Sequence, residues 1–269
     1  MQKAYDVILA PNPSIMTGPG TNTIVLGGGI EGATVIDPAV DDTAYLDTLI
    51  EAGEERGDIR RILITHGHPD HIGGAMALRK RLGIYIYAFS RQGVPFADEE
   101  VADGTEFPAG DDRLIAIHTP GHRFDHLGFL LEKQGTFFAG DLISGITTNV
   151  IAPPDGDMLD YLNSLKRLQE VDISEIVPSH GPTITDAQAK ITEYIQHRML
   201  REQQVIQTLE AMTPGVTIAE MVPRIYVDVD PKLHPIAAWS VEAHLIKLER
   251  EGLVEKLEEE RWALVRPTA

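Results

Sequence analysis

The chain contains the stretch Thr65-His66-Gly67-His68-Pro69-Asp70-His71, in which three histidines and one aspartate fall within six positions. Only ten of the 269 residues are histidine, so this pattern arises by chance roughly once in 10³ chains of this length. Neutral imidazole is a common metal ligand, whereas clustered imidazoles repel one another when they are protonated. We therefore interpret the stretch as part of a metal site.

Three further candidate ligands each follow a short apolar run that is typical of a strand. They are His122 after residues 114–119, Asp141 after residues 136–139 and His180 after residues 176–178. Loops at strand ends, held by a rigid sheet, can bring distant sequence positions to one place, as metal coordination requires. Each residue alone is a weak signal, but their order after the first cluster indicates one shared site.

Around these motifs, residues 4–182 alternate short β-rich runs with helical runs, which predicts an α/β fold. We expect strands at 5–10, 23–27, 33–37, 61–65, 84–88, 113–119, 126–132, 135–139 and 175–178. Helices are expected from a cap at Asp41 or Asp42 to about 56, at 72–82 and at 158–170.

After residue 186 the alternation of short β-rich and helical runs gives way to mainly helical runs. We expect a long helix at 187–212, a break at Thr213-Pro214-Gly215, helices at 218–226 and 235–251, and a two-stranded ribbon at 253–257 and 261–265. This is the order of a winged helix, which introduces a nucleic-acid-binding regulator as an alternative function. Residues 232–251 carry three basic and three acidic side chains, however, and a recognition helix needs net positive charge. We therefore expect no binding to double-stranded DNA.

Composition narrows the function classes further. The chain has 23 Lys and Arg against 41 Asp and Glu, and its formal net charge of −18 disfavours nucleic acid and anionic membranes as partners. No run approaches the ~18 apolar residues of a membrane helix, and the first residues lack the pattern of an export signal. The absence of cysteine excludes disulfides, thiolate catalysis and Cys-ligated metal. We expect a cytoplasmic protein whose metal would be held by His, Asp or Glu.

The motifs T-H-x-H-x-D-H, T-P-G-H, G-D and S-H-G occur in this order within residues 18–182. In this the chain resembles the metallo-beta-lactamase superfamily. The resemblance implies an αβ/βα four-layer sandwich at residues 1–198, followed by a small C-terminal winged-helix domain at 199–269. It also implies two metal ions, the first held by His66, His68 and His122, the second by Asp70, His71 and His180, with Asp141 bridging both.

The implied ligand set bears on mechanism. Seven ligands for two ions leave positions for a bridging hydroxide and a substrate, as a catalytic site requires. Imidazole and carboxylate ligands suit Zn²⁺ best, and Mn²⁺ or Fe²⁺ is compatible with the same set. We therefore predict a dinuclear metal-dependent hydrolase that uses a metal-bridging hydroxide, which Asp70 orients as the catalytic carboxylate.

A closer resemblance, to the beta-lactamase-like protein 2 subgroup, rests on residues 18–23, 160–165 and 197–204 and on the winged-helix tail. That subgroup includes single-stranded RNA endonucleases, so the resemblance implies single-stranded RNA as a substrate and a homodimer as an assembly. The negative net charge favours the alternative, a small ester, thioester or lactone. The candidate substrate contacts are Arg123, His126, Tyr161, His197 and Arg198, of which His126 can instead tie down a ligand.

Overall fold

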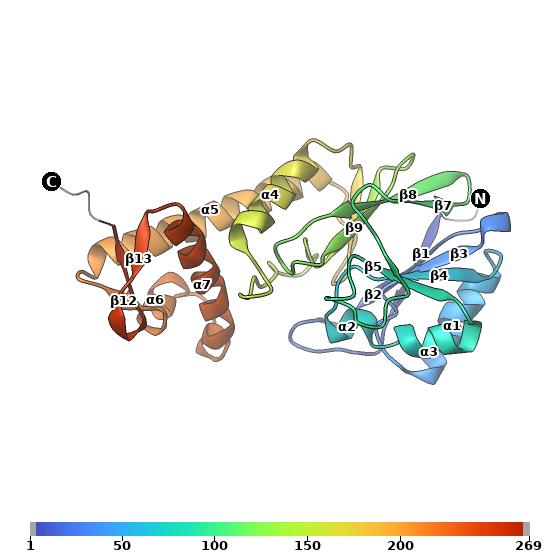
Figure 1. Cartoon of the computed structure of the whole chain (residues 1–269), viewed down its shortest axis with the longest axis horizontal. Helices are drawn as coiled ribbons and strands as arrows, with labels where there is room; N and C mark the ends of the chain where they lie inside the picture. Colours follow the sequence, from blue (N-terminus) through green and yellow to red (C-terminus); the bar gives the residue numbers. More distant parts are fainter. Residues whose placement is uncertain (1–3, 266–269) are drawn as a thin grey trace.

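The computed structural model describes residues 4–265 and contains two β-sheets that face each other (Figure 1). The first sheet has six strands in the order β1-β2-β3-β4-β5-β6: β1 (Tyr5–Leu9), β2 (Asn22–Gly27), β3 (Ala33–Ile36), β4 (Ile59–Leu63), β5 (Tyr85–Ala88) and β6 (Glu99–Glu100). The second has five in the order β11-β10-β9-β8-β7: β7 (Glu106–Ala109), β8 (Asp112–His118), β9 (Leu127–Leu131), β10 (Thr136–Gly140) and β11 (Glu175–Pro178). Parallel pairs β3–β4, β4–β5 and β10–β11 require crossovers, which the helices provide.

Helices cover the outer face of each sheet, which gives four layers (Figure 1). The first sheet carries α1 (Thr43–Glu54), α2 (Pro69–Ile72) and α3 (Ala75–Leu82), and the second carries α4 (Met158–Gln169) and the first half of α5 (Ala187–Ala211). Between the sheets, Leu26 and Leu63 pack with Leu114, Phe129 and Phe138. The αβ/βα sandwich expected from the sequence is confirmed.

The cap and the buried leucines of α4 show why this helix forms and which of its faces packs against the sheet. Asp157 caps the helix by accepting hydrogen bonds from the backbone N–H groups of Leu159 at 2.9 Å and Asp160 at 3.0 Å. Leu165 and Leu168 lie on the buried face and are fully shielded from solvent. Burial of each such side chain stabilises the fold by about 1.5–3 kcal/mol.

The C-terminal unit is a winged helix, as expected, with one more strand than the sequence indicated. It consists of α6 (Ile218–Ile225), α7 (His234–Arg250), β12 (Val216–Thr217), β13 (Val254–Lys256) and β14 (Arg261–Leu264). The expected two-stranded ribbon is a three-stranded sheet in the order β12-β14-β13, because Val216 and Thr217 pair with β14. A strand of two residues has no periodicity by which a sequence could reveal it.

Helix α5 links the two units. Ile191 and Tyr194 in its first half belong to the core beneath the second sheet, whereas Val205 and Leu209 in its second half belong to the winged-helix core. The division predicted between residues 198 and 199 therefore lies within one continuous 25-residue helix. Neither α5 nor any other helix within residues 4–265 has the length and apolar character to cross a membrane.

Two expectations in the sandwich differ from the structure. The helix expected at 72–82 is divided into α2 and α3, because Gly73 and Gly74 pass close to the backbone of Ala39 and Val40. A Cβ on either glycine would lie 2.4 Å from a carbonyl oxygen of that segment, so neither position has room for a side chain. Strands β6 and β7 were not expected, because one is two exposed residues long and the other contains Pro108.

Candidate metal centre

The candidate ligands reach one region because each follows the end of a strand. The stretch 65–71 follows β4, His122 follows β8, Asp141 follows β10 and His180 follows β11. His68 occupies the residue before α2 and Pro69 the first helical position, which a proline suits because its φ is already helical. Asp70 and His71 are thereby held in the first turn of a helix.

His66, His68, His122 and Asp141 form one group, whose ligand atoms lie within 4.8 Å of one another. Nδ1 of His68 lies 2.9 Å from Nε2 of His66 and 3.1 Å from Nε2 of His122. Oδ2 of Asp141 lies 3.6 Å from Nε2 of His122. Three imidazoles and one carboxylate oxygen thus converge on a single point.

Asp70, His71 and His180 form a second group within the same limit. Oδ2 of Asp70 lies 3.4 Å from Nε2 of His180 and 3.7 Å from Nε2 of His71. Asp141 also faces this group, with Oδ1 at 3.3 Å from Nε2 of His180 and Oδ2 at 3.6 Å from Nε2 of His71. The carboxylate of Asp141 therefore stands between the two groups.

These donors fit divalent cations. Nε2 of His71 is buried and has no hydrogen-bond partner among the described residues, although two carboxylates stand near it. Burial, reinforced by neighbouring imidazoles, lowers the pKa of His66 well below its usual range and that of His68 to about 3. These rings are therefore neutral at pH 7, which is the form that binds a metal.

Contacts within the centre shift the pKa values of its other members. Burial opposes charge on His71, yet the carboxylates of Asp37 and Asp141 raise its pKa well above the usual range. Burial likewise opposes charge on His180, and hydrogen bonds to Asp141 and Asp70 raise its pKa to about 9. Burial would raise the pKa of Asp141, but His71 and His180 lower it well below the usual range. The charges of the centre thus compensate one another in a largely buried site.

Asp37 supports the centre and was not identified from the sequence. Its Oδ2 accepts hydrogen bonds from Nδ1 of His71 at 2.7 Å and from Oγ1 of Thr65 at 2.6 Å, and its Oδ1 accepts one from the Thr65 N–H at 2.8 Å. This fixes the ring of His71 with Nε2 turned towards the two candidate ligands Asp70 and Asp141. The available signal was its place directly after β3, as with Asp141 after β10.

His126 lies behind the centre. Its Nε2 accepts a hydrogen bond from the Asp141 N–H at 3.0 Å, and its Nδ1 bonds Oγ1 of Thr119 at 2.8 Å. The side chain is fully buried, so the structure places it where it holds the backbone of Asp141. His118, by comparison, stacks on Phe89 with ring centroids 3.8 Å apart.

Arg123 is the substrate candidate with a positive charge beside the histidine stretch, and that charge is already neutralised. It donates to Oδ1 of Asp125 at 2.7 Å and pairs with Asp155 at 3.1 Å. Oδ2 of Asp125 in turn accepts from the Gly67 N–H at 3.0 Å. A Cβ at Gly67 would lie 2.2 Å from the carbonyl oxygen of Gly93, so this position has no room for a side chain.

The remaining candidates lie further from the ligands. Tyr161 is fully buried and donates to the carbonyl oxygen of Leu142 at 2.6 Å. Arg198 is 2% exposed, lies with its guanidinium 5.1 Å from the Tyr161 ring centroid, and donates to the carbonyl oxygen of Asn149 at 2.5 Å. The side chain of Asn149 donates to the carbonyl oxygen of Asp141. Arg198 is thus connected to the centre through one residue, and His197 is half-buried beside it on α5.

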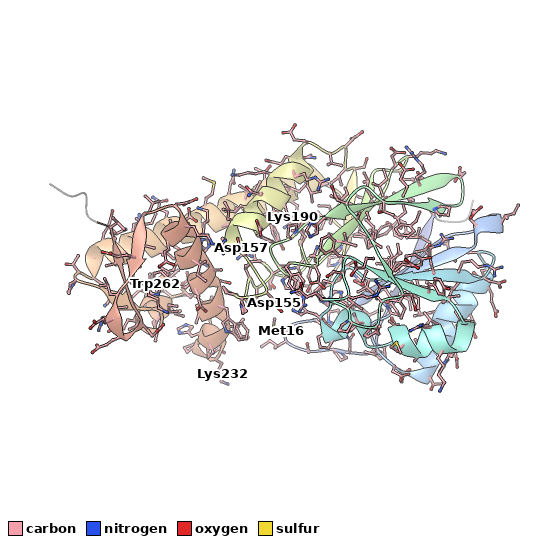
Figure 2. The ribbon with its side chains drawn as sticks, in the orientation of Figure 1. Met16, Asp155, Asp157, Lys190, Lys232 and Trp262 are labelled. Carbon is pink, nitrogen blue, oxygen red and sulfur yellow. The ribbon has the colours of Figure 1, made fainter. Side chains whose placement is uncertain are left out.

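Apolar side chains stand exposed near His180. Ile146 packs over the Cα positions of Gly18 and Gly181, and Gly181 directly follows His180. Ile146, Ile15 and Met16 are 48%, 77% and 54% exposed. Figure 2 shows Met16 and Asp155 on the side of the sandwich that faces the C-terminal unit. We call Ile15, Met16 and Ile146 the apolar rim.

A four-layer αβ/βα sandwich with a His- and Asp-rich centre at its strand ends defines a class of metal-dependent hydrolases. The chain belongs to the metallo-beta-lactamase superfamily, whose sequence profile matches residues 16–180. The profile of the beta-lactamase associated winged helix domain matches residues 217–262. The resemblance inferred from the motifs is confirmed.

Relatives extend this similarity over nearly the whole chain. A beta-lactamase-like protein 2 homolog of Drosophila melanogaster is 33% identical, and the match covers 97% of this chain and 94% of the relative. A protein of Aspergillus chevalieri named atrochrysone carboxyl ACP thioesterase is 32% identical, over 81% of this chain and 72% of its own. The structure of a metallo-beta-lactamase family protein from Thermus thermophilus covers 97% of this chain and 99% of its own with a TM-score of 0.80; at 21% identity it supports the fold alone.

Proposed function

We propose that the protein is a dinuclear metal-dependent hydrolase of a small acyl thioester or related ester. The observation that carries the dinuclear assignment is the carboxylate of Asp141, whose oxygens lie 3.3–3.6 Å from the imidazole nitrogens of His71, His122 and His180. In this proposal His66, His68 and His122 would hold one ion, Asp70, His71 and His180 would hold the other, and Asp141 would contribute to both. Two divalent ions, Zn²⁺ in our proposal, would lower the pKa of an attacking water and polarise the scissile carbonyl.

Asp70 supplies the chain's own contribution to the chemistry in this proposal. Its side chain is 28% exposed against 13% for Asp141, so it is the carboxylate that a bound water can reach. Although burial opposes it, the hydrogen bond from His180 lowers the pKa of Asp70, which keeps the group ionised at pH 7. An ionised carboxylate accepts a hydrogen bond and so orients the water for attack.

The surroundings of the centre favour an acyl substrate over single-stranded RNA. Arg123 is the cation next to the histidine stretch, and both Asp125 and Asp155 pair with it. The apolar rim offers Ile15, Met16 and Ile146 to a ligand, and the formal net charge is −18. A polyanion gains little binding free energy from these surroundings, because its binding depends on Lys and Arg side chains that no carboxylate neutralises. The named thioesterase activity of the Aspergillus chevalieri relative supports the same choice.

The test compares substrates on one preparation. Zn²⁺-loaded and Mn²⁺-loaded protein is given acetyl and octanoyl thioesters of N-acetylcysteamine, a lactone, and end-labelled single-stranded RNA. We expect thiol release, faster for the octanoyl thioester, that is lost in His68→Ala and retained in the control His118→Gln, a histidine outside the centre. RNA cleavage that requires His68, without thiol release, would replace the thioesterase proposal with the endonuclease that the subgroup resemblance predicts.

A further inference from the structure

Buried polar atoms without partners gather at a second place in the molecule. Within residues 4–265, seven buried side-chain atoms lack a hydrogen-bond partner. One is Nε2 of His71 in the metal centre and one is Oδ2 of Asp112; the other five are all nitrogens on α5 and α7: Nδ1 of His197, Nε of Arg198, Nε of Arg201, Nε2 of His234 and Nε2 of His244. Buried donors without an acceptor are rare in folded proteins and call for an explanation.

Four of these side chains are close together, and we call them the α5–α7 nitrogen cluster: His197, Arg198, Arg201 and His244. His197 and Arg198 are consecutive residues of α5, and Arg201 lies about one turn further along the helix. His244 of α7 joins them through Glu202, which follows Arg201 and whose Oε2 is 3.3 Å from Nδ1 of His244. Burial, followed by the charges of Arg198 and Arg201 and by His244, lowers the pKa of His197 to about 4. Burial also lowers the pKa of His244, so the cluster contains two cations and two neutral imidazoles at pH 7.

The cluster has an unbalanced positive charge. Neither Arg198 nor Arg201 forms an ion pair with a carboxylate in the described part of the chain; their donors meet the carbonyl oxygens of Asn149 and Ile225 and the side chain of Gln204. The nearby carboxylate of Glu202 is already shared by Lys247 at 3.0 Å and His244. Arg198 and His244 are 2% and 1% exposed. A buried charge without a counter-ion is costly, so an anion is the group that this place lacks.

We propose that the α5–α7 nitrogen cluster binds a terminal phosphate group of the substrate. Two guanidinium groups offer planar forks that suit phosphate oxygens, and the imidazole nitrogens add donors from other directions. Arg198 and His244 are deeply buried, which suits the end of a ligand rather than a polymer backbone. His197 and Arg201 are half-buried, and they form the side of the cluster that is open to solvent. The contact from Arg198 through Asn149 to Asp141 places this site next to the metal centre.

This inference rests on the proposed function and names the substrate class within it. Hydrolysis of an acyl thioester releases a carboxylic acid and a thiol. The cluster would hold a phosphate on the thiol portion while the carbonyl lies at the metal centre. The substrate would accordingly be an acyl thioester whose leaving thiol carries a terminal phosphate.

The binding test uses the full chain after treatment with a chelator, with inorganic phosphate as the probe and calorimetry as the readout. We expect phosphate to bind and the dissociation constant to rise at least ten-fold in Arg198→Met and in His197→Gln. Lys190→Met, which removes a partly exposed cation from the same helix, serves as the control and should bind phosphate as the parent does (Figure 2). If Arg198→Met does not fold, His197→Gln, which replaces a half-buried side chain, carries the test. Absent binding, or equal binding in all proteins, would overturn the proposal.

A kinetic comparison tests the phosphate site separately from the proposed thioesterase function. Two thioesters with the same acyl group are compared, one with a phosphorylated leaving thiol and one without the phosphate. We expect the preference in kcat/KM for the phosphorylated thioester to fall at least ten-fold in His197→Gln. Hydrolysis of both thioesters without any preference would overturn the phosphate site alone, whereas hydrolysis of neither would overturn the proposed function. Dependence of single-stranded RNA binding on these residues, with no binding of inorganic phosphate, would also contradict a terminal-phosphate site.

Discussion

Oδ2 of Asp37 lies 2.7 Å from Nδ1 of His71, and the opposite nitrogen of the same ring faces Asp70 and Asp141. The orientation of this candidate ligand is therefore set by a carboxylate that contacts no other member of the centre. Such supporting groups usually change metal affinity or activity by about 10–100-fold when removed.

We expect Asp37→Asn to weaken metal binding in the group formed by Asp70, His71 and His180. Asparagine has one accepting oxygen where Asp37 uses two, so whichever way the amide is turned its NH2 group meets a donor, either the Thr65 N–H or the side chains of His71 and Thr65. The ring of His71 therefore loses its fixed direction. Metal content measured by mass spectrometry should fall from two ions per chain towards one, with activity about 10–100-fold lower. The exposed Asp41→Asn is the matched control, and two firmly held ions in Asp37→Asn would contradict the positioning role.

Replacement of Asp141 has a larger predicted effect, because its carboxylate faces imidazoles of both groups. We expect Asp141→Asn to lose both ions and all hydrolytic activity, since a neutral amide cannot bridge two cations as a carboxylate does. Metal analysis after dialysis, together with a circular dichroism spectrum to show a native fold, is the measurement. Retention of two ions per chain would contradict the bridging assignment.

The contact between α4 and α7 yields a prediction about stability. Asp157 caps α4 and also pairs with Arg250 of α7, so one carboxylate serves two elements. We expect Asp157→Ala to lower the free energy of unfolding by about 1–2 kcal/mol, mainly through the lost cap. Arg250→Ala, which removes only an exposed ion pair, should cost less than about 1 kcal/mol. Urea denaturation of both variants and of the double variant checks this, and equal losses would show that the cap is unimportant.

The lowered pKa of His197 predicts how the free energy of unfolding depends on pH. Its pKa is about 4 in the folded chain against 6.5 for an ordinary histidine, because burial and neighbouring arginines disfavour its charged form. Between pH 6.5 and pH 4 the unfolded chain therefore binds a proton that the folded chain does not, and the free energy of unfolding falls as the pH falls. His197→Gln should reduce this slope in thermal unfolding measured at pH 7 and pH 5. An unchanged slope would show that other groups cause the loss.

Sequence reasoning predicted the elements that have strong periodicity and the ligands that have fixed spacing. The leucine pattern of α4 and the histidine stretch at 65–71 are local signals, readable without knowledge of what packs against them. Their convergence with Asp141 and His180 was inferred from the positions of these residues after strands, and the structure brings these side chains within a few ångströms. Their role as metal ligands stays a prediction that the metal analyses above test.

The parts that could not be predicted depend on contacts between distant segments. Asp37 carries no motif, and its role follows only from the approach of Thr65 and His71. For His126 the sequence left two roles open, contact with substrate or support of a ligand, and only the structure shows its hydrogen bond from the Asp141 backbone. Strand β12 exists because β14 is available to pair with it, and no local propensity could have indicated this.

The continuity of α5 has a consequence for how the molecule unfolds and is cleaved. A 25-residue helix is about 37 Å long, and each of its halves completes a different apolar core. Neither unit can lose its half of the helix without destabilising the other, so we expect the two units to unfold in a single cooperative transition. A protease that cuts within α5 consequently yields no pair of separately folded fragments, and the winged helix cannot be exchanged as an independent module.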